Sequence, residues 1–200
     1  MLKISQAEIP LAAKILARGF FDDPMLSFIF LERENRLDAL TAFFQVFLAD
    51  TVRRGEVLIA PNEAGAIAWY PTGIRLFDDC FNEVLAKLTE IITTFGGLLA
   101  AERFEQIASQ AEKFEPKQVH CEVMWIALIP EARGKGIGRD LLSPVLNHAD
   151  EQQVSCYLVS SNLKNISFYE GHGFRQIFSI PINSQLSLTG MWRDAVNKIN

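Results

Sequence analysis

Three glycines alternate with charged and apolar residues in the segment Arg133–Gly138, which reads RGKGIG. The segment follows a continuous apolar run, Val123–Ile129, that is typical of a buried strand, and a helical pattern begins at Arg139. Glycine permits positive φ angles and lets another molecule approach the backbone closely. A helix start offers unpaired amide N–H groups and a partial positive charge, which together favour phosphate. We therefore expect a phosphate-binding loop made of Arg133, Gly134, Lys135, Gly136, Ile137 and Gly138.

A second motif follows the next apolar strand pattern, Cys156–Val159, and runs from Asn162 to Phe174 as NLKNISFYEGHGF. The phosphate loop, with its R-x-x-G-x-G pattern, resembles the pyrophosphate loop of the GNAT superfamily of acetyl-CoA-dependent N-acetyltransferases. The second segment, with its asparagine, its later tyrosine and its Gly-Phe pair, resembles the next motif of that superfamily. The C-terminal half also resembles the branch that includes puromycin N-acetyltransferase.

The resemblance implies direct transfer of an acetyl group from acetyl-CoA to a primary amine of a small molecule or peptide. This reaction needs a base or a water path for the ammonium, donors for the developing oxyanion, and an acid for the leaving thiolate. The resemblance assigns the acid to Tyr169, because the tyrosine at this motif position commonly lies near the thioester sulfur. An unperturbed phenol has a pKa of about 10, so it is protonated at neutral pH. The alternative interpretation is that Tyr169 is a core aromatic residue beside Phe168.

Glu122 is the candidate base, because it precedes the apolar part of the strand where some GNAT enzymes carry a catalytic glutamate. A carboxylate at the mouth of an apolar strand should have a raised pKa and could accept a proton near neutrality. A solvated charge at the strand end is the alternative reading, and His120 or water is the alternative base. Strict alternation predicts one face with Glu122, Met124, Ile126 and Leu128, and another with Val123, Trp125 and Ala127.

The resemblance also implies how the rest of acetyl-CoA is bound. The backbone of the strand core, Ile126, Ala127 and Leu128, is expected to pair with the peptide-like pantetheine arm as an added strand would. Asn162 is expected to bond the same arm, although it could equally cap the helix that follows. Phe168 is expected to pack against the cofactor or the core. No metal is expected.

Two other functions fit part of the pattern. A non-catalytic acyl-CoA-binding regulatory module would keep the loop and Asn162 but would not need Tyr169 or Glu122. A dinucleotide-binding protein would need the G-x-G-x-x-G fingerprint, but Arg139 stands where the third glycine should be. The acetyltransferase hypothesis is therefore the leading one.

Helical and strand patterns predict the elements that carry these residues. Ser5 and Glu8 have capping-box spacing before the first helix, and an apolar stripe with Gly55 at its end predicts a helix over Arg36–Arg54. A hairpin is expected over 56–70. The stretch Asp78–Glu115 reads as two helices interrupted at Gly96 and Gly97, and in GNAT proteins this part of the chain forms the wall of the acceptor site.

The fold class that follows is α/β. A strand, a helix and a second apolar strand imply a parallel pair with a right-handed crossover, and the hairpins imply antiparallel strands. The expected result is a central mixed sheet of about seven strands with helices on both faces, as in the GNAT fold. We expect residues 1–200 to form a single domain, since this length is enough for one sizeable core.

Composition limits the partners. The net charge of −5 argues against general nucleic-acid binding. No apolar stretch looks long and unbroken enough for the ~20 residues of a membrane span, and the N-terminus lacks a signal-peptide pattern. The three cysteines, Cys80, Cys121 and Cys156, are odd in number and are expected to be buried reduced thiols in a cytoplasmic protein. A homodimer through the late strands, 174–193, is possible, and the amine acceptor is not identified.

Overall fold

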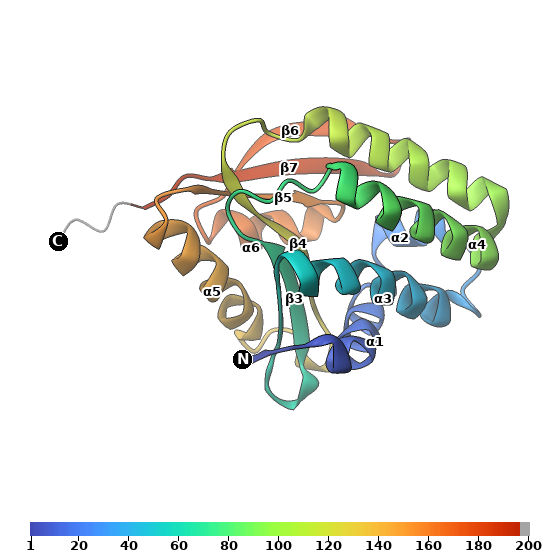
Figure 1. The fold of residues 1–200 in the computed structure, drawn as a ribbon, viewed down its shortest axis with the longest axis horizontal. Coiled ribbons are helices and arrows are strands. Elements are labelled where there is room, and N and C mark those ends of the chain that lie inside the picture. Colours follow the sequence, from blue (N-terminus) through green and yellow to red (C-terminus); the bar gives the residue numbers. More distant parts are fainter. Residues whose placement is uncertain (197–200) are drawn as a thin grey trace.

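A mixed sheet forms the centre of the protein, as the computed structural model shows for residues 1–196 (Figure 1). Within these residues the sheet has seven strands in the order β1-β2-β3-β4-β5-β7-β6. The pair β4–β5 is parallel and the other neighbouring pairs are antiparallel, so the predicted mixed sheet is confirmed. The strands are β1 (Leu2–Lys3), β2 (Glu56–Ile59), β3 (Gly65–Tyr70), β4 (His120–Leu128), β5 (Ser155–Ser160), β6 (Arg175–Pro181) and β7 (Ser187–Arg193).

Helices cover both faces of the sheet, as expected. One face packs against α1, α3 and part of α4, and the other packs against α5 and α6 (Figure 1). Each face has its own buried apolar cluster, so the sheet is the wall between two cores. The helices are α1 (Ile9–Gly19), α2 (Pro24–Ile29), α3 (Arg36–Arg54), α4 (Asp79–Phe114), α5 (Ile137–Glu151) and α6 (Ile166–Glu170).

The parallel strands β4 and β5 separate part-way along their length. Their pairing runs from His120 opposite Ser155 to Val123 opposite Leu158 and then stops. Beyond that point β4 continues to pair with β3 as far as Leu128, while β5 pairs with β7. The edge of β4 that faces β5 therefore has unpaired main-chain groups after Val123.

A β-bulge in β4 changes which residues share a face. Ala68 lies opposite Trp125 but Trp69 lies opposite Val123, so Met124 is the extra residue. The prediction from strict alternation is therefore wrong after Met124, because one extra residue moves every later side chain to the other face. Trp125 and Ala127 pack in the core of α1 and α3 on the same side as Met124, whereas Ile126 and Leu128 pack toward α5.

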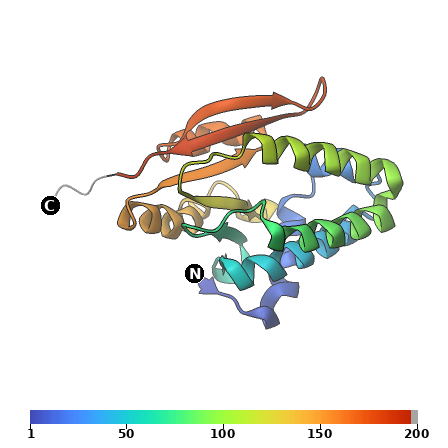
Figure 2. The ribbon, with the colours of Figure 1, turned by 45° about the horizontal axis from the view of Figure 1, so that its top comes forward.

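The helix α4 reverses direction at Gly97, where φ is 74° and ψ is −176°. Figure 2 shows its two arms, green and yellow-green, lying side by side as a helical hairpin. Its ends meet: Arg75, just before the first arm, donates to Glu115, just after the second, with an Nη2–Oε2 distance of 3.0 Å. The predicted interruption at Gly96 and Gly97 is confirmed.

By length and composition alone, α4 is long and apolar enough to cross a membrane, the one such helix found among residues 1–196. Its most apolar window has a mean hydropathy of 1.5, so the expectation that no stretch reaches this length is wrong. That expectation treated the glycine pair as the end of an apolar run, whereas the apolar residues continue beyond it. The reversal at Gly97 divides these 36 residues between two shorter arms.

A buried ionic cluster joins α3 to β3 and to the start of α4. The Asp50 carboxylate accepts hydrogen bonds from Arg54 and from the Tyr70 hydroxyl, the latter at 2.7 Å. Arg54 also bonds Asp78, which caps α4 through the amide of Phe81. These buried ion pairs and hydrogen bonds thus fix the position of α3 relative to β3 and to the start of α4.

The cysteines differ in exposure. Cys121 and Cys156 are buried opposite one another on β4 and β5, as the sequence led us to expect. Cys80 is exposed at the start of α4, so the expectation of three buried thiols is wrong for this residue. Cys80 lies in the first turn of α4, outside the buried face of that helix.

Candidate active site

The phosphate loop forms a left-handed turn before α5. Gly134 has φ 74° and Gly136 has φ 80°, a region that side chains with a Cβ rarely adopt. Gly136 is the N-cap of α5, and its carbonyl accepts from the amides of Arg139 and Asp140. Within residues 1–196 the amides of Gly134, Lys135 and Gly136 have no hydrogen-bond partner. The loop therefore presents free donors together with the positive end of a helix, which suits a phosphate group.

Two positive side chains of the loop are held by carbonyl groups. Arg133 donates from Nη2 to the carbonyl oxygen of Gly19 at 2.9 Å, at the end of α1. Lys135 donates from Nζ to the carbonyl oxygen of Glu131 at 2.8 Å. Both charges lie beside the loop, and each would have to release its carbonyl to contact a phosphate directly.

The loop also contacts the second motif. A Cβ added at Gly138 would lie 3.4 Å from the ring of Phe168, so α5 and α6 approach closely here. Phe168 is half-buried in the core on the α5 side, with the ring of His172 at a centroid distance of 4.6 Å. Two motifs that are 24 residues or more apart in sequence (Gly138 to Asn162) thus meet in space.

Asn162 acts as a helix cap in the structure. Its side-chain oxygen accepts from the amide of Lys164 at 3.1 Å at the start of a short 3₁₀ helix, Leu163–Asn165. The capping interpretation is therefore confirmed. A role in binding a cofactor stays a prediction.

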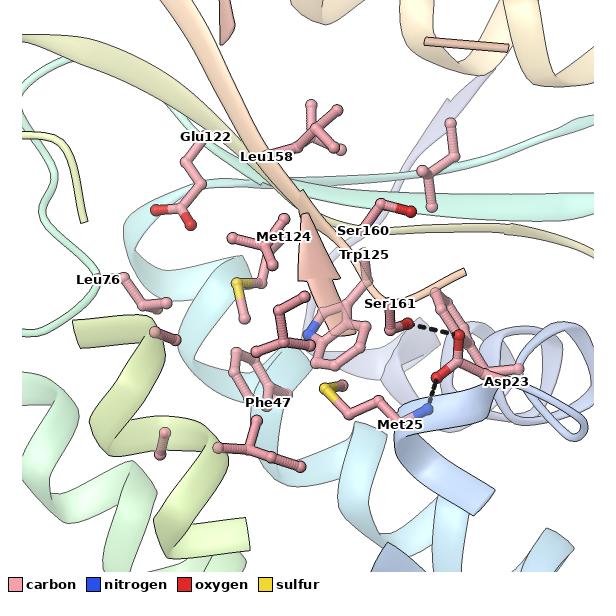
Figure 3. A pocket seen from close by; sticks show the side chains of 18 of the residues that line it. Asp23, Met25, Phe47, Leu76, Glu122, Met124, Trp125, Leu158, Ser160 and Ser161 are labelled. Carbon is pink, nitrogen blue, oxygen red and sulfur yellow. Dashed lines mark hydrogen bonds between the residues drawn. The ribbon is translucent and has the colours of Figure 1, made fainter. Parts of the chain in front are cut away.

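A cavity of about 130 Å³ extends from the gap between β4 and β5 to the helical hairpin. Both arms of α4 form part of its wall, together with α2, α3 and the segment between α1 and α2. Glu122 lies at one end and Asp23 at the other, with Met124, Trp125 and Phe47 between them (Figure 3). The site is thus continuous from the second motif to the helical insert.

Tyr169 lies on this cavity and is 7% exposed. Burial raises the pKa of its phenol, and the nearby charge of Asp23 raises it further. The hydroxyl therefore keeps its proton throughout the neutral range. Tyr169 is suited to donate a proton at the inner edge of the second motif.

Glu122 lies at the end of the cavity away from Asp23 (Figure 3) and is 6% exposed. Burial raises the pKa of its carboxyl to about 8, and the nearby Glu115 carboxylate contributes. No side chain within residues 1–196 hydrogen-bonds this carboxyl group. The solvated-charge interpretation of Glu122 is therefore wrong, because the side chain is buried on the cavity wall.

His120, the alternative base, is placed differently. Its Nδ1 lies 2.7 Å from the carbonyl oxygen of Gln118, and its ring packs against Tyr157 and Trp192. Burial lowers its pKa. His120 is not among the described residues that line the cavity.

Sequence reasoning missed several polar residues of the cavity, among them Asp23, Ser161 and Glu115. Asp23 is buried, caps α2 through the amides of Met25 and Leu26, and accepts from the Ser161 hydroxyl at 2.8 Å (Figure 3). The Asp-Pro pair at 23–24 signals such a cap but says nothing about what faces it. Glu115 reaches the cavity from the end of α4, which no local pattern indicates.

No group of three or more His, Cys, Asp or Glu residues suited to a metal ion occurs in the described part of the chain. The expectation of a metal-free reaction stays a prediction.

The geometry joins a free-amide loop, an open strand edge and a buried tyrosine in one site. A family model for the acetyltransferase (GNAT) domain matches residues 92–176, which include all three features. Residues 92–176 carry the acetyltransferase domain of the GNAT superfamily. The match ends near the start of β6, and the N-terminal helices lie outside it.

One curated relative and two solved structures are also similar to this chain. An uncharacterized N-acetyltransferase of Schizosaccharomyces pombe is 26% identical over 194 residues, which are 92% of this chain and 78% of the relative. A Corynebacterium glutamicum structure described as histone acetyltransferase HPA2 and related acetyltransferase is 20% identical, with a TM-score of 0.71 and coverage of 99% and 97%. Arylalkylamine N-acetyltransferase 2 of Aedes aegypti is 14% identical, with a TM-score of 0.61 and 98% coverage of both chains. These two structures share the fold.

Proposed function

We propose that this protein transfers the acetyl group of acetyl-CoA directly to a primary amine. The observation that carries the proposal is the shared cavity. It holds a buried acid, Tyr169, and a buried carboxyl, Glu122, on either side of the point where β4 and β5 separate. A regulatory module that only binds acyl-CoA would need neither group there.

The residues around the cavity fit the parts of acetyl-CoA. The free amides of the phosphate loop and the start of α5 suit its pyrophosphate. The unpaired main-chain edge of β4 at Ile126, Ala127 and Leu128 suits the amides of its pantetheine arm, which would pair there as a strand would. The side-chain amide of Asn162 has a donor group left after capping, and Phe168 offers an apolar surface beside the loop.

When bound, acetyl-CoA supplies an acetyl group activated as a thioester. Glu122 takes a proton from the substrate ammonium, so that the nitrogen lone pair can attack the thioester carbonyl carbon. An unpaired N–H of β4 donates to the carbonyl oxygen as it becomes negative. Tyr169 gives its proton to sulfur as the carbon–sulfur bond breaks. The nitrogen loses two protons in all: one leaves through Glu122, and the other replaces the proton that Tyr169 gave to sulfur.

The raised pKa of Glu122 suits this role. A carboxyl with a pKa of about 8 gains and loses its proton close to neutral pH, and its ionised form is a stronger base than an ordinary glutamate. An arriving ammonium ion favours the ionised form, so substrate binding itself prepares the base.

The proposal is tested by calorimetric titration of the purified protein with acetyl-CoA, CoA and NAD. We expect acetyl-CoA and CoA to bind and NAD not to bind. A Gly136→Trp variant serves as the control, since a large side chain at a position with φ 80° would obstruct the loop. Absence of acetyl-CoA binding to the folded wild-type protein would overturn the proposal.

Catalysis is tested separately from binding. Release of free thiol from acetyl-CoA is followed with a library of amines, and Tyr169→Phe is run alongside. Acetyl-CoA binding that is tight but gives no amine-dependent thiol release with any acceptor would favour the regulatory module instead.

A further inference from the structure

The charges on the cavity wall all have one sign. Among residues 1–196 the side chains that line it include three carboxyl groups, those of Asp23, Glu115 and Glu122, and no Lys, Arg or His. A buried carboxylate is costly unless a cation or hydrogen-bond donors accompany it. Asp23 has such donors in the amides of α2 and the Ser161 hydroxyl. At the other end, the donor is Arg75, which bonds one oxygen of Glu115, and no side chain among the described residues bonds Glu122.

At that other end, Glu115 is held in place but not satisfied. Its side chain is 4% exposed. The Oε2 atom accepts from Arg75, whereas the Oε1 atom is buried and has no hydrogen-bond partner among the described residues. The carboxylate therefore keeps one acceptor free on the cavity wall.

Two further groups surround the same point. Tyr157 lies opposite Glu122 in the β4–β5 pairing, and its hydroxyl is also buried without a partner in the described part of the chain. All three residues line the same cavity. Burial raises the pKa of the Tyr157 hydroxyl, and the charges of Glu122 and Glu115 raise it further. Three elements, the end of α4, β4 and β5, thus direct unsatisfied oxygens to one place.

The remainder of the cavity is apolar and largely aromatic. Its wall includes Phe43, Phe47, Phe77, Phe81, Phe104 and Trp125. A sugar or a peptide would have to leave many polar groups there without hydrogen bonds, at a cost of roughly 1–3 kcal/mol for each group. The volume of about 130 Å³ is close to that of an apolar cavity of about 150 Å³ that binds benzene.

We propose that the acceptor is a primary amine on a compact apolar body of aromatic size, and that Glu115 and Glu122 together bind its ammonium group. The proposal rests on the acetyltransferase function above and names its substrate class. Glu122 is the member that takes the proton. Glu115, at the end of the helical insert, is a binding residue that provides the second negative charge. Arg75 orients its carboxylate.

The first experiment measures the acceptor class with the full chain. Thiol release from acetyl-CoA is compared for benzylamine and 2-phenylethylamine, and for spermidine, glucosamine and a short peptide with a free N-terminus. We expect kcat/KM to be at least about 100-fold higher for the two aromatic amines, because the polar acceptors lose hydrogen bonds in the cavity. Equal or better turnover of the polar amines would overturn this inference while leaving the acetyltransferase function in place.

Binding without turnover gives a second, independent measurement. Calorimetry of the protein with CoA present compares 2-phenylethylamine with 2-phenylethanol, which has the same body and no charge. We expect the amine to bind at least about tenfold more tightly, because an ion pair needs the ammonium. Binding of both with equal affinity, or of neither, would overturn the inference. A protein that fails to bind acetyl-CoA would instead contradict the function on which it rests.

The role of Glu115 is tested with Glu115→Gln, and Glu112→Gln is the matched control, because Glu112 is exposed on the same arm and does not line the cavity. We expect Glu115→Gln to raise the KM for the amine about 10- to 100-fold and to leave the KM for acetyl-CoA unchanged. Glu115→Asp should restore part of the affinity. An unchanged KM for the amine in a folded Glu115→Gln variant would overturn the assignment.

A pH profile separates binding from a structural role. The charged or titratable groups around Glu122 are Glu115 from α4, Tyr157 from β5 and His120 from β4, with Arg75 behind Glu115. Removing the Glu115 charge should move the acid limb of kcat/KM to lower pH, because that charge favours the protonated form of Glu122. An acid limb that stays in place would contradict the pairing of the two carboxyl groups.

Discussion

The two ends of the substrate site are built in opposite ways. The phosphate loop presents main-chain amides and positive charge, and all of its parts lie within a few consecutive residues. The other end, the proposed acceptor end, presents side chains and negative charge, and its parts come from α2, α3, α4, β4 and β5. In the proposed function, the first end would bind its ligand through backbone geometry, and the second would bind its ligand through side chains that several distant segments bring together.

This difference predicts how each end responds to substitution. At the loop the important property is the φ angle, so the effect of a side chain depends on conformational freedom and on the space left for a ligand. At the acceptor end the important property is chemical identity, so replacement by a side chain of the same shape removes function and keeps the fold. The largest effects on rate are therefore expected at Glu122 and Tyr169.

Glu122→Gln is expected to lower kcat/KM about 1,000-fold near pH 8, because it removes a positioned base without changing the shape of the cavity. In the wild-type protein, kcat/KM should rise with pH through the pKa of Glu122 at about 8, since the ionised form is the active one. The variant should lack this acid limb. A pH–rate profile of both proteins checks the prediction, and a variant that retains the limb would assign it to another group.

The same substitution has a consequence for stability. Folding raises the pKa of Glu122 from 4.5 to about 8, so the folded state holds this proton more tightly than the unfolded chain does. The contribution of this protonated carboxyl to the free energy of unfolding is fully present below pH 4.5. It is lost as the pH rises to about 8, by roughly 3–5 kcal/mol in total. Relative to the wild type, Glu122→Gln should therefore gain stability between pH 6 and 9. Denaturant unfolding at several pH values measures this, with Glu112→Gln as an exposed control that should show no such trend.

Tyr169→Phe is expected to lower kcat about 100-fold with an unchanged Kd for acetyl-CoA, because it removes the proton donor and keeps the ring. Tyr70→Phe is the matched control: the Tyr70 hydroxyl bonds Asp50 and does not line the cavity. That control should lose stability and keep its rate. Stopped-flow thiol release and equilibrium titration check the pair. Equal rate losses in both variants would show that Tyr169 acts through packing.

The features that the sequence predicted are those set by neighbouring residues. The bounds of α3, Arg36–Arg54, follow from its apolar stripe and from Gly55, and the interruption of α4 follows from Gly96 and Gly97. The parallel β4–β5 pair and the glycine turn before α5 also follow from local patterns. In each case the energy that decides the structure, a cap, a φ angle or a periodic apolar face, acts over a short stretch of chain.

The features that it did not predict depend on distant contacts. The bulge at Met124 appears only when β4 pairs with β3, and it reverses the faces of Trp125 and Ile126. The strand β7 inserts between β5 and β6, which alternation within each strand does not specify. Glu115 follows a helix end and precedes a proline, so it looks like an ordinary solvated residue until the hairpin brings it to the cavity.

Gly136→Ala tests whether the loop acts through its backbone. Because φ is 80° here, a Cβ should cost about 1 kcal/mol of stability, and it should weaken acetyl-CoA binding roughly 10- to 100-fold by displacing amides from the phosphate. Gly73→Ala is the matched control: its φ is 87°, open space surrounds it, and it lies away from the loop. It should lose similar stability and keep its affinity. Thermal unfolding and calorimetric titration of both proteins check this, and equal losses of affinity would show that strain alone is responsible.

Of these substitutions, Gly138→Ala should have the smallest effect on acetyl-CoA binding. It tests whether the turn at Gly134 and Gly136 and the start of α5 contribute separately. Gly138 lies inside α5 at an ordinary φ angle, and an added Cβ would meet the Phe168 ring at 3.4 Å, close to an ordinary contact. Alanine also favours a helix over glycine, so stability should change by less than about 1 kcal/mol. We expect the Kd for acetyl-CoA to rise only a few-fold, since the left-handed turn at Gly134 and Gly136 is kept. A loss as large as that of Gly136→Ala would mean that the phosphate sits against Gly138 itself, so that close approach to the helix start, rather than the turn, determines binding.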